Sequence, residues 1–305
     1  MLKLYHKILY NILESIYCYM QQLKLGGILL PQQIIDLSTP MEKNNGEIAK
    51  FKMKQTKHKE GGDLFGRRQA FSRKETLKQT ILSIYHYLTG QRRITSKSFP
   101  NREFLNQEII TASTHTATHF DAPLHFGSES ERKPAPSIDE IPVEWCFGDG
   151  VLLDMRFKEP GEFITSADID HELRRIQYEL KPLDIVIIWT GAEQYWGKKE
   201  YLYKYPGMSK EATSYLIDRG IKIICIDSYG FDRPFKNMMY DYFTTLDNQY
   251  LFPAHFFGRE KCYCHVERLM NLELLPKPYG FKISCLPIKI KGAGASWSRV
   301  VAIIT

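Results

Sequence analysis

The sequence predicts an α/β fold, a single mixed domain preceded by a helical extension. Short apolar runs alternate with amphipathic helical patterns through the second half of the chain, which is typical of α/β proteins. No repeat period or low-complexity stretch interrupts this alternation. Hydrophobic residues make up 43% and charged residues 25% of the 305 residues, a balance that supports a large globular core. We place the extension at residues 1–33 and the domain at residues 34–305.

The first 24 residues predict an amphipathic helix. Apolar side chains recur there at helical spacing, at Leu4, Ile8, Ile12, Ile16, Tyr19 and Leu23. Two glycines and Pro31 then break the pattern. Because an exposed apolar face of this size is unusual on a monomer, the helix packs either on its own domain or on a partner chain. We favour the partner and expect a homo-oligomer, a dimer at least.

Predicted elements follow in order along the domain. A short strand entering a turn is expected at 33–41, and the polar, Lys-rich and Gly-containing stretch 42–66 predicts a loop. Ser72 and Glu75 form a capping box ahead of a helix at 76–90. Further strands are expected at 108–114, 150–155, 184–190, 222–227, 281–290 and 299–304, and helices at 166–180 and 209–220.

Targeting signals and cysteines both indicate the cytoplasm. Asn11 and Glu14 interrupt the first apolar run and no small-residue cleavage site follows, which argues against a signal peptide. No apolar stretch reaches the ~18 residues of a membrane span. Four of the six cysteines are isolated in apolar surroundings, as reduced core cysteines are, and Cys262 with Cys264 lacks the spacing of a zinc or redox motif.

Basic residues are concentrated in one stretch. Between Lys43 and Lys97 there are 14 basic and 4 acidic residues, a net +10, which leaves −4 for the rest of a chain whose total is +6. Such a stretch can bind nucleic acid or lipid. Because no nucleic-acid motif accompanies it, we interpret it as solvated surface and expect a small-molecule substrate, with neither nucleic acid nor a membrane as partner.

The segment STHTATHFDAPLHF, residues 113–126, holds the densest group of chemically active side chains. His115, His119, Asp121 and His125 fall within eleven residues. On an extended chain all four face one side, and Asp121 lies ~7 Å along the chain from His119. His115 and His119 would lie ~13 Å apart on a straight strand. They can share one metal ion only if the intervening backbone bends.

A helical arrangement of this segment is less favoured. Its threonines are β-branched, and Pro123 would interrupt a helix. Imidazole with carboxylate suits Zn²⁺, Mn²⁺ or Fe²⁺ and is poor for Ca²⁺. A single histidine here would be read as a turn cap or a core hydrogen-bonding group. Three histidines and an aspartate on one face favour a metal site.

The same segment resembles a known family. HTATHFDAPLH is similar to the H-x-G-T-H-x-D-x-P-x-H signature of the cyclase-like metal-dependent hydrolases. That family includes bacterial kynurenine formamidases, isatin hydrolases and some aromatic polyketide cyclases. Further segments resemble the family in its order, from about residue 34 to the C-terminus. Ala117 stands where the signature has glycine, which restricts the backbone at the bend but removes no ligand.

The resemblance implies a swivelling β/β/α fold and a site with one or two divalent ions, zinc or manganese. His115, His119 and Asp121 match the ligands of the first ion, and Asp121 would bridge to a second. The second ion's other ligands would be His125, His255 and Glu267. His265 is a nearby competitor that matches no signature position.

The resemblance also implies a reaction. The leading hypothesis is hydrolysis of an amide, lactam or lactone by a metal-activated water, an arylformamidase-like reaction in which His125 or Glu267 moves the proton. The alternative is a polyketide cyclase that uses the same metal and base. A third hypothesis, a binding protein that has lost its chemistry, is opposed by the intact ligand set.

Other candidates are weaker. Asp227 and Asp232 follow a predicted strand, where they could line a pocket or cap turns, and both interpretations stay open. Trp145, Trp189 and Trp196 are better explained by core packing. The glycine-rich turn at 292–296 lacks the lysine and following helix of a phosphate site.

Overall fold

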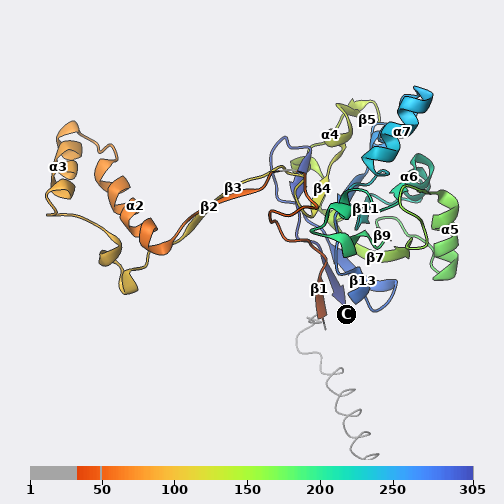
Figure 1. Ribbon diagram of the computed structural model, residues 1–305, viewed down its shortest axis with the longest axis horizontal. Coiled ribbons are helices and arrows are strands. Elements are labelled where there is room, and N and C mark those ends of the chain that lie inside the picture. Colours follow the sequence, from red (N-terminus) through yellow and green to blue (C-terminus); the bar gives the residue numbers. More distant parts are fainter. Residues whose placement is uncertain (1–32, 49, 305) are drawn as a thin grey trace, which may run out of the picture. The chain divides into compact units, whose positions relative to one another are not determined.

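The computed structural model describes residues 33–48 and 50–304, and these divide into two compact units (Figure 1). Among the described residues, the sheet unit comprises 33–40 and 117–304, and the hairpin unit comprises 41–48 and 50–116. The sequence indicated no division at these positions. The predicted extension lies outside the described residues except for Gln33, so its boundary stays a prediction.

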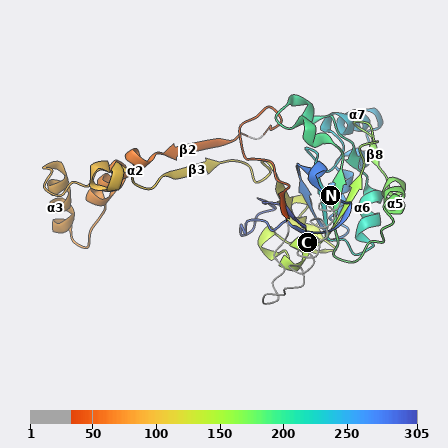
Figure 2. The same cartoon turned by 90° about the horizontal axis from the view of Figure 1, so that it is seen from below.

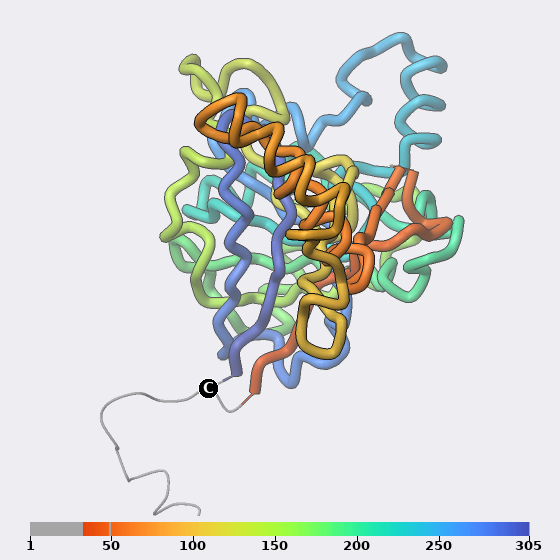
Figure 3. The backbone as a smooth tube through the Cα atoms, turned by 90° about the vertical axis from the view of Figure 1, so that its left-hand side faces the viewer, coloured from red at the N-terminus to blue at the C-terminus, as the bar shows by residue number. Residues whose placement is uncertain are grey.

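A nine-stranded mixed sheet forms the sheet unit and confirms the predicted α/β class. Its order is β1-β15-β13-β7-β9-β11-β12-β4-β14. The central pairs β7–β9, β9–β11 and β11–β12 are parallel, and the outer pairs are antiparallel. The strands are β1 (Gln33–Asp36), β4 (His119–Asp121), β7 (Phe147–Asp154), β9 (Ile185–Trp189), β11 (Ile223–Ile226), β12 (Cys264–Glu267), β13 (Tyr279–Ser284), β14 (Ala295–Trp297) and β15 (Val301–Ile304). Figure 3 shows the antiparallel β13 and β15 in blue.

Strands β9 and β11 are apolar along their whole length because both faces of the sheet are covered there. In β9, Ile185 and Ile187 belong to one hydrophobic core, whereas Val186 and Ile188 belong to the core on the opposite face. The second core includes Leu173 and Leu216, from two helices that pack against each other (Figure 2). The helices of this unit are α4 (Pro123–Phe126), α5 (Ser166–Arg175), α6 (Lys210–Ile217), α7 (Phe235–Thr245) and α8 (Pro253–Phe257).

Short elements complete the described chain. The two-stranded ladders are β5 (Glu129–Ser130) with β6 (Lys133–Pro134), and β8 (Phe163–Ile164) with β10 (Gly207–Met208). The 3₁₀ turns are η1 (Ser96–Ser98), η2 (Pro100–Arg102), η3 (Ile138–Glu140), η4 (Val143–Cys146), η5 (Ala192–Tyr195), η6 (Lys199–Leu202), η7 (Asn248–Tyr250) and η8 (Leu272–Leu274). Within residues 33–48 and 50–304, none of the helices combines the length and apolar character needed to cross a bilayer. The cytoplasmic location stays a prediction.

The hairpin unit contains structure where the sequence predicted a loop. An antiparallel ribbon of β2 (Lys52–Thr56) and β3 (Gln107–Thr111) leads to the helices α2 (His58–Phe71) and α3 (Leu77–Leu88). The loop prediction for 42–66 is therefore wrong. The glycines that suggested a loop let another backbone segment approach α2, since a Cβ added at Gly66 would lie 1.8 Å from the Ile94 carbonyl oxygen.

The helix predicted at 76–90 is confirmed by α3, but the residues that cap its N-terminus differ from the predicted ones. Thr76 accepts a hydrogen bond from the Gln79 amide, and the Gln79 side chain accepts one from Thr76, so the capping box lies four residues after the predicted one. None of the α3 residues is buried. Its apolar stripe faces outward, and consists of Leu77, Ile81, Tyr85 and Leu88.

We predict that Gly66→Ala destabilises the hairpin unit by about 1–3 kcal/mol, the usual cost of overpacking. Amide hydrogen exchange should show faster opening across 58–105 and unchanged protection in the central strands of the sheet unit. Arg67→Ala, at an exposed position of the same helix, is the matched control. Equal protection in wild type and Gly66→Ala would contradict the close packing of α2.

Candidate metal centre

The candidate site is built by the pairing of two short strands. In the antiparallel ladder of β4 with β12, His119 lies opposite Glu267 and Asp121 lies opposite His265. Directly opposed residues point to the same face of a sheet. The intervening Phe120 and Val266 point the other way, into the first hydrophobic core. Four polar side chains therefore share one face, and all four are buried.

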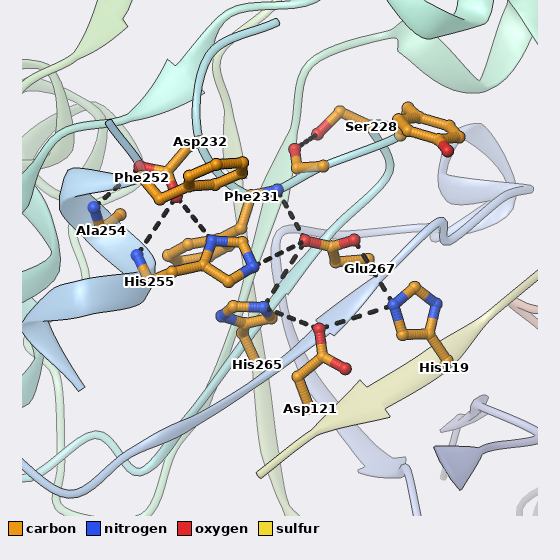
Figure 4. A network of polar contacts seen from close by, with 12 residues as sticks. His119, Asp121, Ser228, Phe231, Asp232, Phe252, Ala254, His255, His265 and Glu267 are labelled. Atoms are coloured by element: carbon orange, nitrogen blue, oxygen red, sulfur yellow. Dashed lines mark hydrogen bonds and ion pairs between the residues drawn. The ribbon is translucent and has the colours of Figure 1, made fainter. Parts of the chain in front are cut away.

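The side chains converge through their ligand atoms (Figure 4). Asp121 Oδ2 lies 3.5 Å from His119 Nε2 and 3.1 Å from His265 Nε2. The two oxygens of Glu267 face different histidines. Oε2 lies 3.4 Å from His119 Nε2, and Oε1 lies 3.5 Å from His265 Nε2. Both carboxylates therefore lie between His119 and His265. The period-two prediction for His119 and Asp121 is confirmed.

Helix α8 adds His255, whose Nε2 lies 3.7 Å from Glu267 Oε1. The other ring nitrogen, Nδ1, lies 2.5 Å from Asp232 Oδ2. Asp232 also accepts hydrogen bonds from the backbone amides of Ala254 and His255. With Nδ1 donating to Asp232, Nε2 faces the carboxylates as an acceptor, the arrangement found for metal-binding histidines. Asp232 therefore binds amides in the first turn of α8, close to the capping role left open for it, and in addition orients a residue of the site.

His119 is oriented in a similar way by a bend in the backbone. Its Nδ1 lies 2.8 Å from the Ala117 carbonyl oxygen, to which it donates, so Nε2 faces Asp121 and Glu267. Ala117 has φ +58°, in the left-handed region that favours glycine. The predicted bend is therefore present, and it lies at the residue that replaces the signature glycine.

The two remaining predicted ligands occupy different surroundings. His125 lies on α4 and is exposed, with its ring centroid 5.6 Å from that of His255. One of its ring nitrogens lies within 4.8 Å of a carboxylate oxygen of Asp121. Gly294 leaves room for it, because a Cβ there would lie 3.1 Å from the His125 backbone. His115 is half-buried and belongs to the hairpin unit, so its role as a ligand stays a prediction.

The spacing of these atoms fits a metal ion. Ligand atoms of Asp121, His255, His265 and Glu267 all lie within 4.8 Å of one another. Around a tetrahedral ion with bonds of about 2.0–2.2 Å, ligand atoms lie roughly 3.3–3.6 Å apart. The closest observed separations, 3.1–3.7 Å, are of this size. The donor set of imidazole and carboxylate is one that divalent transition metals accept.

The carboxylates also change the acidity of their neighbours. Burial by itself lowers the pKa of His119, but Asp121 and Glu267 raise it to about 9. Burial raises the pKa of Glu267, but the hydrogen bond and charge of His119 bring it down to about 2. Burial and the charge of His255 lower the pKa of His265. The two carboxylates therefore attract positive charge, which a proton or a divalent cation can supply.

Asp227 has a structural role. Its carboxylate accepts hydrogen bonds from the amide and hydroxyl of Thr190 at 2.7 Å, and from the amide of Glu193 at 3.3 Å. These contacts fix the turn after β9. Trp189 donates to Glu193 and stacks with Arg156, which agrees with the packing role predicted for it.

Two residues of the cluster were not selected from the sequence. Asp232 was left undecided, and His265 was set aside because it matches no signature position. An alternating pair at 265 and 267 could have indicated that His265 shares a face with Glu267. That signal depends on recognising the four-residue strand β12, which the sequence prediction did not include.

Comparisons with known proteins identify the family and the fold. A family model described as "Putative cyclase" matches residues 35–233. An uncharacterised protein of Methanocaldococcus jannaschii is 30% identical over 152 residues, covering 50% of this chain and 66% of that protein. The kynurenine formamidase of Geobacillus thermodenitrificans is 25% identical over 192 residues, covering 63% and 77%. Isatin hydrolase A from Labrenzia aggregata has the same fold, with a TM-score of 0.61, 21% identity, and coverage of 95% and 99%.

We predict that Ala117→Gly raises the free energy of unfolding by about 0.5–1 kcal/mol. Relief of the left-handed strain, ~1–2 kcal/mol, exceeds the entropic cost of glycine, about 0.5–1 kcal/mol. Denaturant unfolding measures the change. Ala122→Gly is the matched control, because Ala122 is also buried but has φ −92°, and it should destabilise. Equal destabilisation by both substitutions would show that the bend at Ala117 is not strained.

Proposed function

Because this chain belongs to the putative cyclase family, we propose that it is a metal-dependent hydrolase of an amide, lactam or lactone, with an arylformamidase-like reaction. The observation that carries the proposal is the convergence of the buried His119, Asp121 and Glu267 with the half-buried His255 of α8. The names of two similar proteins, a kynurenine formamidase and an isatin hydrolase, support a hydrolase.

The proposed cofactor is one or two divalent ions, zinc or manganese. Glu267 presents one oxygen to His119 and the other to His255, which supports a carboxylate shared between two ions. Asp121 lies between His119 and His265, where it would hold a metal ion as the family signature implies. His115 and His125 complete the proposed ligand set. When bound, a divalent cation here supplies an acidified water and a positive charge that polarises the substrate carbonyl.

His125 is the proposed proton carrier. Its side chain is exposed, unlike those of the other histidines of the sheet-unit cluster, so it can meet both substrate and solvent. Glu267 is the weaker candidate for this role. Its Oε1 accepts a hydrogen bond from the Phe231 amide at 2.7 Å, and both of its oxygens face histidines. A carboxylate held in this way is suited to ligation more than to proton transfer.

The alternative is a metal-dependent cyclase acting on a polyketide, and its support is limited to the description of the family as cyclases. A cyclase would use the same carboxylates and histidines to hold its metal ion. A panel of aryl formamides and cyclic amides separates the two candidates. Turnover of any of these substrates by the metal-loaded protein supports the hydrolase.

We predict that Glu267→Gln weakens metal binding at least about 10–100-fold, the size of loss typical of altered metal-site partners, and abolishes turnover while the fold is kept. Metal content after dialysis and circular dichroism measure the two effects. Glu273→Gln, an exposed neighbour on η8, should behave as wild type. Full metal content and activity in Glu267→Gln would refute its assignment as a ligand.

We also propose that the protein is a homo-oligomer, a dimer at least. The exposed apolar stripe of α3 supports this, since Leu77 is 75% and Leu88 68% exposed and such patches mark contact sites. The helix α3 belongs to a unit whose sheet is the two-stranded ribbon of β2 and β3. Because a two-stranded ribbon is only marginally stable by itself, a contact with a second subunit would stabilise this unit.

The oligomer proposal predicts that Ile81→Glu with Leu88→Glu shifts the protein toward monomer, because both charges would be buried in the contact. Light scattering at micromolar concentration measures the mass. Lys78→Glu, a charge change on the same helix outside the stripe, is the control and should leave the mass unchanged. A monomeric wild-type protein would defeat the proposal.

A further inference from the structure

His265 occupies a position at the centre of the cluster that the family signature does not assign. Its Nε2 lies 3.1 Å from Asp121 Oδ2 and 3.5 Å from Glu267 Oε1. The side chain has no exposed surface. Figure 4 shows its ring between His255 and Asp121, directed toward both carboxylates. The position of His265 follows from the pairing of β12 with β4, which places His265 opposite Asp121.

Aromatic neighbours hold the ring in this orientation. The imidazole stacks on Phe231 with centroids 4.3 Å apart and an interplanar angle of 14°. Phe126 lies 4.9 Å away at 34°. Among the described residues, Nδ1 is buried without a hydrogen-bond partner. The polar chemistry of the side chain is therefore directed through Nε2 alone.

The distances from His265 Nε2 to the carboxylate oxygens indicate whether a shared proton or a metal ion holds these groups together. A hydrogen-bonded network would bring donors and acceptors to about 2.7–3.2 Å, and only the contact with Asp121 is that short. The separations of His265 Nε2 and His255 Nε2 from Glu267 Oε1, 3.5 and 3.7 Å, are too long for hydrogen bonds. The first lies within, and the second just above, the spacing of atoms that share one tetrahedral ion, roughly 3.3–3.6 Å.

We propose that His265 is a protein ligand, together with Asp121, His255 and Glu267, of one divalent ion, and that it closes the coordination of that ion. This inference rests on the proposed function. Four protein ligands are the mark of a structural zinc site, whereas a catalytic ion keeps an open position. The open position then belongs to the part of the cluster around His119. His265 takes the place on this ion that the family signature gives to His125, which leaves His125 for proton transfer. Two imidazoles also favour zinc over magnesium or calcium.

The test uses full-length apo protein titrated with Zn²⁺ and, separately, with Co²⁺. Wild type, His265→Ala and His265→Gln are compared, and His171→Ala on the exposed face of α5 is the control. Competition with a chelator gives the affinity of each ion. The visible spectrum of the cobalt protein reports coordination number, because four-coordinate Co²⁺ absorbs much more strongly than six-coordinate Co²⁺.

Both His265 variants should lose at least about tenfold in affinity for one ion, by comparison with the 10–100-fold typical of altered metal-site partners, and show a weaker cobalt band. Unchanged affinity and spectrum would overturn the role of His265 while leaving the metal enzyme intact. Absence of metal binding in wild type would overturn the proposed function itself. If the variants do not fold, the wild-type cobalt spectrum decides, since a weak band excludes the closed four-ligand site.

Discussion

The antiparallel register between β4 and β12 is the constraint on which the site depends. It sets His119 opposite Glu267 and Asp121 opposite His265, which gives two carboxylates and two imidazoles one shared face. A slip of β4 by one residue would turn His119 and Asp121 into the hydrophobic core and bring Phe120 out of it. The pairing of β4 with β14 on its other side and of β12 with β11 fixes this register.

Bringing these groups together is unfavourable for the fold unless positive charge accompanies them. Removing carboxylates from water costs several kcal/mol per ion, and Asp121 and Glu267 are both buried. Neighbouring groups offset this cost, and the hydrogen bond and charge of His119 lower the pKa of Glu267. Phe231 donates one amide to Glu267, and Asp232 uses its carboxylate to orient His255. A bound divalent cation would therefore stabilise the native state as well as supply the chemistry.

Local patterns in the sequence predicted what depends on local geometry. The shared face of His119 and Asp121 follows from a period of two, and the bend that the histidine spacing required is found at Ala117. His255 and Glu267 lie on different elements from Asp121, so only the family resemblance linked them to it. His265 was set aside because it matches no signature position, and β12, with four residues and no long apolar run, gave no separate signal for it. The loop prediction for 42–66 was wrong because the glycines of α2 lie in a helix, where they allow another backbone segment to pack closely.

The most direct test of the central claim is a crystal structure of metal-loaded protein with anomalous diffraction collected on both sides of the zinc absorption edge. We expect an anomalous peak within about 2.0–2.2 Å of the Nε2 atoms of His255 and His265 and of carboxylate oxygens of Asp121 and Glu267. A catalytically active crystal form with no anomalous density at this cluster would contradict the account.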